Sequence, residues 1–230
     1  MTEVSEEGES IFCEKAEKEQ KTELCPSASN ANGLVVRPMS VDDADIVARL
    51  TVKAFKAKFE WAVGKKSIEK IVAGQAAENR DPKKYQHRIF IAEYDGKVAG
   101  CIGIKFFGDK HKLLKHNYKG MGCLPLLRLR CMAVSQNEDV KDPTACYINE
   151  LCVAEDYRGK GIGTALLQAA EAEAVKHGCT KTLLHVALGN PALHLYQREG
   201  YKKKGEEIDL ISYCIIGVKG WYFMEKELIT

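Results

Sequence analysis

The chain has 230 residues, of which 45% are hydrophobic, and a formal net charge of +2 at pH 7. That length and composition allow one domain with a sizeable core, and no apolar run approaches the roughly 18 residues that a membrane-crossing helix needs. The N-terminus is acidic and lacks the basic-then-apolar order of a secretory signal. We therefore expect a soluble protein of the cytoplasm.

Nine cysteines are spread along the chain without a C-x-x-C pair. An odd set without paired spacing predicts reduced, mostly buried thiols in a reducing, intracellular compartment. No cluster of cysteine and histidine has the spacing of zinc ligands, so no metal site is predicted. Cys152 is a candidate catalytic thiol, although a buried small hydrophobe is the commoner use of a free cysteine.

The charge is distributed unevenly. Residues 1–33 carry eight glutamates against three lysines, which leaves about +7 on the remainder. Residues 1–32 hold few large apolar groups and are predicted to form a disordered acidic tail ahead of a folded domain at 33–230. The basic domain suits an anionic cofactor, as it would suit many other partners.

The folded part is predicted to begin with a strand at 33–37. Ser40 and the acidic residues after it supply helix-start chemistry, so a helix is expected to about residue 58. Residues 55–79 have mixed helical periodicity. The positions expected to face inward there are Trp61, Val63, Ile68, Ile71 and Val72.

Residues 88–94 and 97–107 flank Asp95-Gly96, which predicts a β-hairpin with a type I′ turn. A strongly basic stretch at 108–130 follows, within an insertion at about 108–143. It could recruit nucleic acid, an acidic protein or a membrane surface, but a solvated helical insertion is favoured. Residues 130–134 and 144–153 are interpreted as strand material.

Glycines at 159, 161 and 163 join the apolar run at 147–153 to a helical pattern. Such a loop lets the main chain approach an anion, and the helix start adds unpaired N–H groups. The dinucleotide fingerprint fails because a third glycine would fall at Thr164, and the P-loop fails because no Gly-Lys-Ser/Thr follows. A purely steric use of these glycines is the alternative.

The helix from residue 163 is expected to end at Gly178, and a buried strand at 182–187 should run parallel to its predecessor. Asn190 and Pro191 start the last helix. Residues 208–218 and 220–228 are predicted to close the sheet as an antiparallel pair. The fold class is therefore α/β, with a mixed sheet of six or seven strands flanked by helices.

The hexapeptide Arg158-Gly159-Lys160-Gly161-Ile162-Gly163 resembles the acyl-coenzyme-A motif of the GNAT N-acetyltransferase superfamily, Arg/Gln-x-x-Gly-x-Gly/Ala. Residues 190–201, with asparagine first and tyrosine in the middle, resemble the family's following helix. The likeness covers roughly 34–228 and is strongest over 147–201. It implies acetyl-CoA as cosubstrate, CoA as product, and a central mixed sheet flanked by helices.

The resemblance assigns the cofactor residues. Backbone N–H groups from Arg158 to Thr164, which include those of Gly159, Lys160, Gly161, Ile162 and Gly163, would hold the pyrophosphate, and Arg158 and Lys160 would add positive charge. The pantetheine arm would pair with Leu151, Cys152 and Val153, one of whose N–H groups could polarise the thioester carbonyl. Asn190 would contact the cofactor, cap its helix, or do both.

Three residues are candidates for proton transfer. Tyr196 matches the family tyrosine that protonates the departing thiolate, although it could instead pack on the helix face. Glu150, a glutamate in a mostly apolar strand, is the first candidate for the base, unless it points to solvent at an edge. His185 is the second candidate, and a satisfied core histidine is its alternative role.

The function predicted is acetyl transfer from acetyl-CoA to an amine, on a small molecule or a protein, by direct attack in a ternary complex. By the resemblance, residues 55–79 wall the acceptor pocket, where Phe55, Phe59 and Trp61 either line the pocket or form plain core. An acyl-CoA sensor without catalysis is the first alternative. A nucleic-acid module built on residues 108–130 is the second and the less favoured. The oligomeric state is left open.

Overall fold

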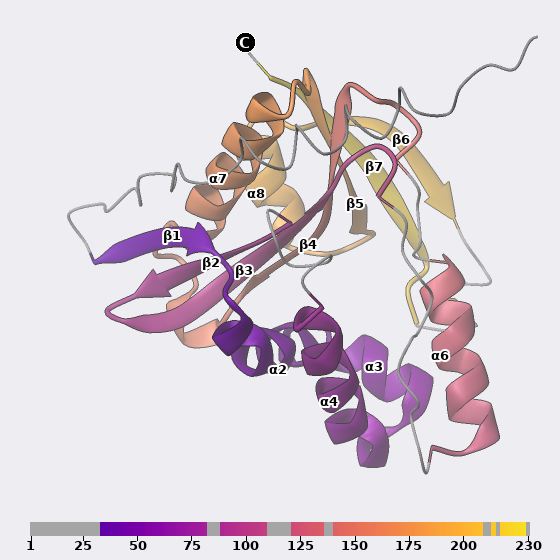
Figure 1. Ribbon diagram of the computed structural model, residues 1–230. Helices are drawn as coiled ribbons and strands as arrows, with labels where there is room; N and C mark the ends of the chain where they lie inside the picture. The colour runs from indigo at the N-terminus through magenta and orange to yellow at the C-terminus, as the bar shows by residue number, and fades with distance from the viewer. Residues whose placement is uncertain are drawn as a thin grey trace, which may run out of the picture.

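The computed structural model describes residues 33–81, 88–109, 121–135, 140–208, 213–214 and 217–228. The predicted acidic tail and residues 110–120 and 136–139 of the predicted insertion lie outside these ranges. The described chain forms a seven-stranded sheet in the order β1-β2-β3-β4-β5-β7-β6 (Figure 1). The strands are β1 (Leu34–Pro38), β2 (Ile89–Tyr94), β3 (Lys97–Lys105), β4 (Ala145–Val153), β5 (Lys181–Ala187), β6 (Lys202–Ile208) and β7 (Gly220–Glu227).

Only the β4–β5 pair of this sheet is parallel, as the crossover through a helix requires. The hairpin of β2 and β3 has Tyr94 opposite Lys97 and turns through Asp95 and Gly96, whose φ angles are 51° and 73°. Two consecutive positive φ angles are those of a type I′ turn. The mixed α/β sheet and its hairpin are thus as the sequence predicts.

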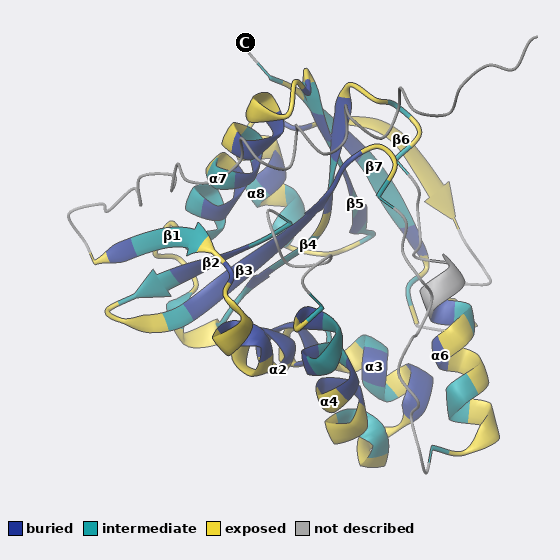
Figure 2. Cartoon of the chain, viewed as in Figure 1, coloured by how far each residue is buried: buried dark blue, intermediate teal, exposed yellow. Residues whose placement is uncertain are grey.

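Two helices cover one face of the sheet, α7 (Ile162–Lys176) and α8 (Ala192–Arg198). Side chains of α7, among them Leu166 and Leu167, pack with Ile102, Leu184 and Met224 of the sheet into the main apolar core. Figure 2 shows this burial as dark blue along the central strands and the inner side of α7. Gly178 follows α7 with a φ angle of +75°, so the helix ends as predicted.

The other face is covered by a helical layer. Its members are η1 (Val41–Asp43), α2 (Ala44–Ala54), α3 (Lys56–Val63), η2 (Lys65–Ser67), α4 (Ile68–Asn79) and α6 (Cys123–Ser135). Met39, Val47 and Leu50 pack there against Ile91 and Cys101 of the sheet. None of the helices in the described ranges is long and apolar enough to cross a bilayer.

Three local predictions are wrong. Residues 130–134 belong to helix α6 instead of a strand, because Leu129 and Met132 pack on α3 and α4. The strand that pairs with β7 is β6 at 202–208, every residue of which is exposed, instead of the predicted 208–218, of which residues 209–212 and 215–216 lie outside the described ranges. Trp61 does not face inward: it is 54% exposed, and its indole N–H donates to the Cys214 carbonyl at 3.2 Å.

Candidate active site

The loop between β4 and α7 is open to solvent where the sequence predicts a phosphate cradle. After β4 the chain forms the short turn η3 (Glu155–Tyr157), and residues 158–161 are all exposed before α7 begins at Ile162. The first intrahelical bond of α7 runs from the Ala165 N–H to the Gly161 carbonyl. The preceding N–H groups of the first turn therefore face outward, with the positive end of the helix dipole behind them.

The three glycines of this loop serve two different purposes. Gly159 and Gly161 have φ angles of +77° and +78°, and a Cβ at either would meet nothing within 4 Å, so backbone conformation decides these positions. Gly163 differs, because a Cβ there would lie 2.9 Å from a Leu195 methyl carbon on α8. That glycine lets α8 pack against the first turn of α7, and the next residue of α8, Tyr196, is close enough to β4 for Cys152 to influence its hydroxyl.

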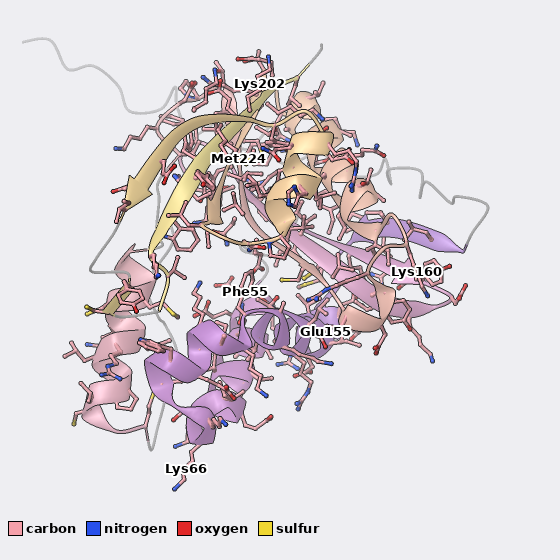
Figure 3. The ribbon with its side chains drawn as sticks, turned by 180° about the vertical axis from the view of Figure 1, so that it is seen from behind. Phe55, Lys66, Glu155, Lys160, Lys202 and Met224 are labelled. Atoms are coloured by element: carbon pink, nitrogen blue, oxygen red, sulfur yellow. The ribbon has the colours of Figure 1, made fainter. Side chains whose placement is uncertain are left out.

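The two basic residues of the loop are held differently. Arg158 is exposed and lies 4.0 Å from Glu155. The Lys160 ammonium stands 4.6 Å from the Tyr94 ring centre and 5.1 Å from that of Tyr157, a pair of rings in edge contact. Figure 3 places Lys160 and Glu155 at the same end of the molecule. Cation–π attraction thus fixes one positive charge beside the loop.

Strand β4 has a free edge beside this loop. It pairs with β3 as far as Val153, but its ladder with β5 covers only residues 145–148, ending at Ile148 opposite Leu184. Within the described ladders, residues 149–153 therefore have no strand on their β5 side. The Ala154 N–H bonds the Ala99 carbonyl, so the alternation of an antiparallel ladder directs the backbone groups of Cys152 toward β3 and those of Leu151 and Val153 toward the free edge. An extended amide-bearing ligand can satisfy the groups of Leu151 and Val153 there.

A β-bulge directs the side chains of β4. Gly103 of β3 lies opposite Glu150, whereas Ile104 lies opposite Ile148, so Asn149 is the extra residue. Ile148 and Leu151 accordingly both pack in the core under α7, while Cys152 packs with the α2 side. Glu150 lies on that same α2 side of the sheet.

Glu150 lies among positive charges on the helical-layer side. A Cβ at Gly103 would lie 3.1 Å from its Cγ, so the glycine makes room for the glutamate. Burial raises the pKa of the Glu150 carboxyl, and the charges of Lys58 on α3 and Lys105 on β3 oppose that rise. Burial also lowers the pKa of Lys58 to about 8 against the attraction of Glu150. A carboxyl whose pKa is raised is a better proton acceptor than an exposed one.

Tyr196 of α8 is 7% exposed, and burial raises the pKa of its hydroxyl. No residue in the described part of the chain hydrogen-bonds this hydroxyl, whereas the nearby Tyr201 hydroxyl accepts from Thr182 at 2.9 Å and donates to Glu171 at 3.1 Å. A buried hydroxyl without a protein partner is destabilising unless a ligand satisfies it. Tyr196 thus holds a proton at neutral pH and has it available.

His185 of β5 lies on the same side of the sheet as Glu150. Its Nδ1 is 3.1 Å from the Tyr147 hydroxyl, and its ring centre is 5.1 Å from that of Phe223. The Lys105 ammonium stands 5.9 Å from the Tyr147 ring centre, which links this aromatic group to the charges around Glu150. His185 therefore belongs to the surroundings of Glu150 as a partnered ring.

Cys152 is 1% exposed, and its hydrogen bond with Cys101 and its burial raise the pKa of its thiol well above the ordinary range. A protonated, buried thiol is a poor nucleophile. Asn190 caps α8, since its Oδ1 accepts from the Ala192 N–H at 2.9 Å. Within the described ranges no three His, Cys, Asp or Glu side chains are grouped to hold a metal ion.

The candidate residues thus fall into two groups. The loop 158–164, the free edge at 151–153 and Tyr196 lie together around the start of α7, and Glu150 and His185 lie on the opposite face of the sheet. Sequence reasoning missed Lys58 and Lys105. Lys105 is 5% exposed and ends the apolar run Gly-Cys-Ile-Gly-Ile, so it carries the same signal that singled out Glu150, a charge within an apolar strand.

Solved N-acetyltransferases share this fold. An N-acetyltransferase from Staphylococcus aureus Mu50 superposes with a TM-score of 0.59 at 19% identity, over 83% of this chain and 99% of that one. The PaiA N-acetyltransferase from Thermoplasma acidophilum, solved in complex with coenzyme A, gives a TM-score of 0.54 at 17% identity, over 84% of this chain and 98% of that one.

The model of the acetyltransferase (GNAT) family matches residues 55–201, and the chain belongs to this family. An N-alpha-acetyltransferase from Sulfurisphaera tokodaii is 31% identical over 123 residues, which cover 53% of this chain and 60% of that protein. The chain thus matches less than two thirds of the length of that relative.

Proposed function

We propose that the chain transfers an acetyl group from acetyl-CoA to a primary amine by direct attack in a ternary complex. The observation that carries this proposal is the juxtaposition of an exposed glycine loop at a helix start with a β4 edge that no described strand pairs beyond Ile148. The first feature suits a pyrophosphate and the second an arm with amide groups. Coenzyme A contains both, in that order.

Acetyl-CoA would supply an acetyl thioester at the β4 edge. Backbone N–H groups of the α7 first turn would hold the pyrophosphate, and those of Leu151 and Val153 would orient the arm and polarise the thioester carbonyl. The Tyr196 hydroxyl, which has no protein partner in the described chain, would give its proton to the departing sulfur. The protonated Cys152 supports attack by the acceptor itself instead of an acyl-cysteine route.

Removal of the amine proton is assigned to Glu150. Its raised pKa makes it a suitable acceptor, directly or through one water molecule, and its two lysine neighbours keep the ionised form available. His185 is the second candidate, held at Nδ1 by Tyr147. The acceptor is an amine of a small molecule or of a protein N-terminus, the latter being suggested by the name of the Sulfurisphaera relative.

The seven described cysteines are all free, which supports a reducing compartment such as the cytoplasm. The decisive experiment for the activity follows thiol release from acetyl-CoA with a panel of amines, in parallel with calorimetry of CoA binding. The proposal expects CoA binding and amine-dependent thiol release. CoA binding with a blank panel would favour a sensor, and absence of CoA binding by folded protein would overturn the cofactor assignment.

A further inference from the structure

Three charged side chains from three elements meet on the helical-layer side of the sheet. Glu150 comes from β4, Lys105 from the neighbouring strand β3, and Lys58 from α3. In the described part of the chain, the charges that shift the Glu150 pKa are those of these two lysines. Lys58 in turn is influenced by Glu150 and Cys152, which places its ammonium beside this stretch of β4.

Both lysines are built into the fold. Lys105 is 5% exposed and stands over the Tyr147 ring. The Lys58 ammonium lies 5.3 Å from the Phe55 ring centre and 5.9 Å from that of Phe59. Phe55 lies between the helical layer and the sheet, whereas Lys66 points away from the sheet at the far end of the layer (Figure 3). Lysines on aromatic rings have less conformational freedom to lose on binding a ligand.

The charge of this cluster is not negative in any of its relevant protonation states. With Glu150 ionised and both lysines protonated, the sum is one positive charge. With Lys58 neutral, since its pKa is lowered to about 8, the sum is zero. With Glu150 protonated and both lysines charged, it is two positive charges. A second cation on an acceptor would meet no net attraction from these three groups in any of the three states, whereas an anion is attracted in the two states that are positive.

We propose that the acceptor carries a carboxylate close to its amine, with Lys58 and Lys105 binding the carboxylate and Glu150 receiving the ammonium. This inference rests on the proposed acetyl transfer and narrows its substrate class. Free amino acids and peptides with an acidic residue at the N-terminus share this chemistry. Polyamines and aminoglycosides, which carry several cations and no carboxylate, are poor acceptors for the same reason.

The test compares acceptors that differ only in the anion. The pairs are phenylalanine with phenethylamine, and a peptide beginning with aspartate with its asparagine counterpart; putrescine represents the polyamines. Binding is measured by calorimetry to protein saturated with CoA, and kcat/KM by thiol release from acetyl-CoA. In at least one pair, the carboxylate-bearing acceptor is expected to have an affinity and a kcat/KM roughly 10- to 100-fold higher than its uncharged counterpart. The pair that shows this preference identifies the acceptor as a free amino acid or as a peptide.

The matched variants are Lys58→Met and Lys105→Met, which keep the length of the side chain and remove its charge. Each should lower affinity for the carboxylate-bearing acceptor about tenfold and leave that for its uncharged counterpart within about twofold. Lys66→Met removes an exposed charge from the same helical layer and should change neither. Unchanged CoA affinity and circular dichroism show that the variants are folded.

The inference is overturned if putrescine or phenethylamine binds as well as the carboxylate-bearing acceptors, or if no acceptor binds. It is also overturned if the lysine variants lower binding of both members of a pair equally. Because binding to the CoA complex is measured without turnover, a preference for carboxylates in protein that releases no thiol would uphold this site while contradicting the proposed catalysis.

Discussion

Replacing Tyr196 with phenylalanine removes one oxygen atom from a buried side chain of α8 and tests the proposed acid directly. Since no described residue hydrogen-bonds that buried hydroxyl, its loss should leave the free energy of unfolding unchanged or raise it by up to about 1 kcal/mol. If the hydroxyl protonates the departing thiolate, kcat should fall by roughly 10²- to 10⁴-fold. CoA affinity, set by the loop and the β4 edge, should stay within about twofold.

Tyr201→Phe is the matched control, because it removes the same atom from a tyrosine 5.9 Å away, ring centre to ring centre. Tyr201 accepts from Thr182, which is 0% exposed, and donates to the Glu171 carboxylate. Losing one neutral and one charge-assisted bond should cost about 3 kcal/mol in unfolding free energy. For a domain of this size that lowers Tm by roughly 6–12 °C.

Steady-state kinetics, CoA calorimetry and thermal unfolding separate the two tyrosines. The expected pattern is lost turnover with normal stability for Tyr196→Phe, and lost stability with near-normal turnover below the transition for Tyr201→Phe. An unchanged kcat in Tyr196→Phe would refute the assigned acid. A Tm loss as large as that of Tyr201→Phe would show that the Tyr196 hydroxyl has a structural partner after all.

Three further predictions concern the loop, the bulge and a lysine. Gly161→Ala forces alanine into a left-handed backbone conformation and should weaken CoA binding about tenfold, by roughly 1–2 kcal/mol. Gly163→Ala clashes with Leu195 instead, so adding Leu195→Ala should restore CoA binding to the Gly163→Ala variant and not to the Gly161→Ala variant. If calorimetry showed the same recovery in both, the backbone role of Gly161 and the packing role of Gly163 would be contradicted. Gly103→Ala presses on the Glu150 side chain and should lower kcat/KM for the acceptor while CoA affinity stays unchanged. An equal loss of CoA affinity would contradict a specific effect on Glu150. Lys58 is charged below its pKa of about 8. An N-acetyl amino acid is a carboxylate probe without an amine, and its affinity should fall as pH rises through about 8 in the parent protein but not in Lys58→Met. An affinity of the parent that does not change with pH would contradict the charge assigned to Lys58.

The sequence predicts the parts of the fold whose local chemistry is decisive. Asp95-Gly96 determines the hairpin turn, and the glycines before α7 determine the loop, because few residues tolerate these backbone angles. Residues 130–134 are too few for their hydrophobic periodicity to distinguish a strand from a helix. The segment is helical because Leu129 packs against the other helices of the layer. Strand β6 gives no apolar alternation, since an exposed edge strand buries neither face.

The position of the candidate base could not be predicted, for a reason that lies in one residue. Strict alternation along β4 would place Glu150 on the same face as Ile148, where its carboxylate would enter the apolar core under α7 without a partner. The bulge at Asn149 reverses the alternation, because it inserts one residue between Ile148 and Glu150.

Leu151 then returns to the core, and Glu150 meets Lys58 and Lys105 on the opposite face. Gly103 stands opposite Glu150 on β3 and leaves room for its side chain. A one-residue change of register flips every following side chain, so the same bulge both keeps the core apolar and puts a carboxylate where an acceptor amine can reach it. Deleting Asn149 would make Ile148 and Glu150 consecutive and leave both on their present faces, so the Gly103→Ala substitution, which acts on the Glu150 side chain itself, is the informative perturbation of this strand.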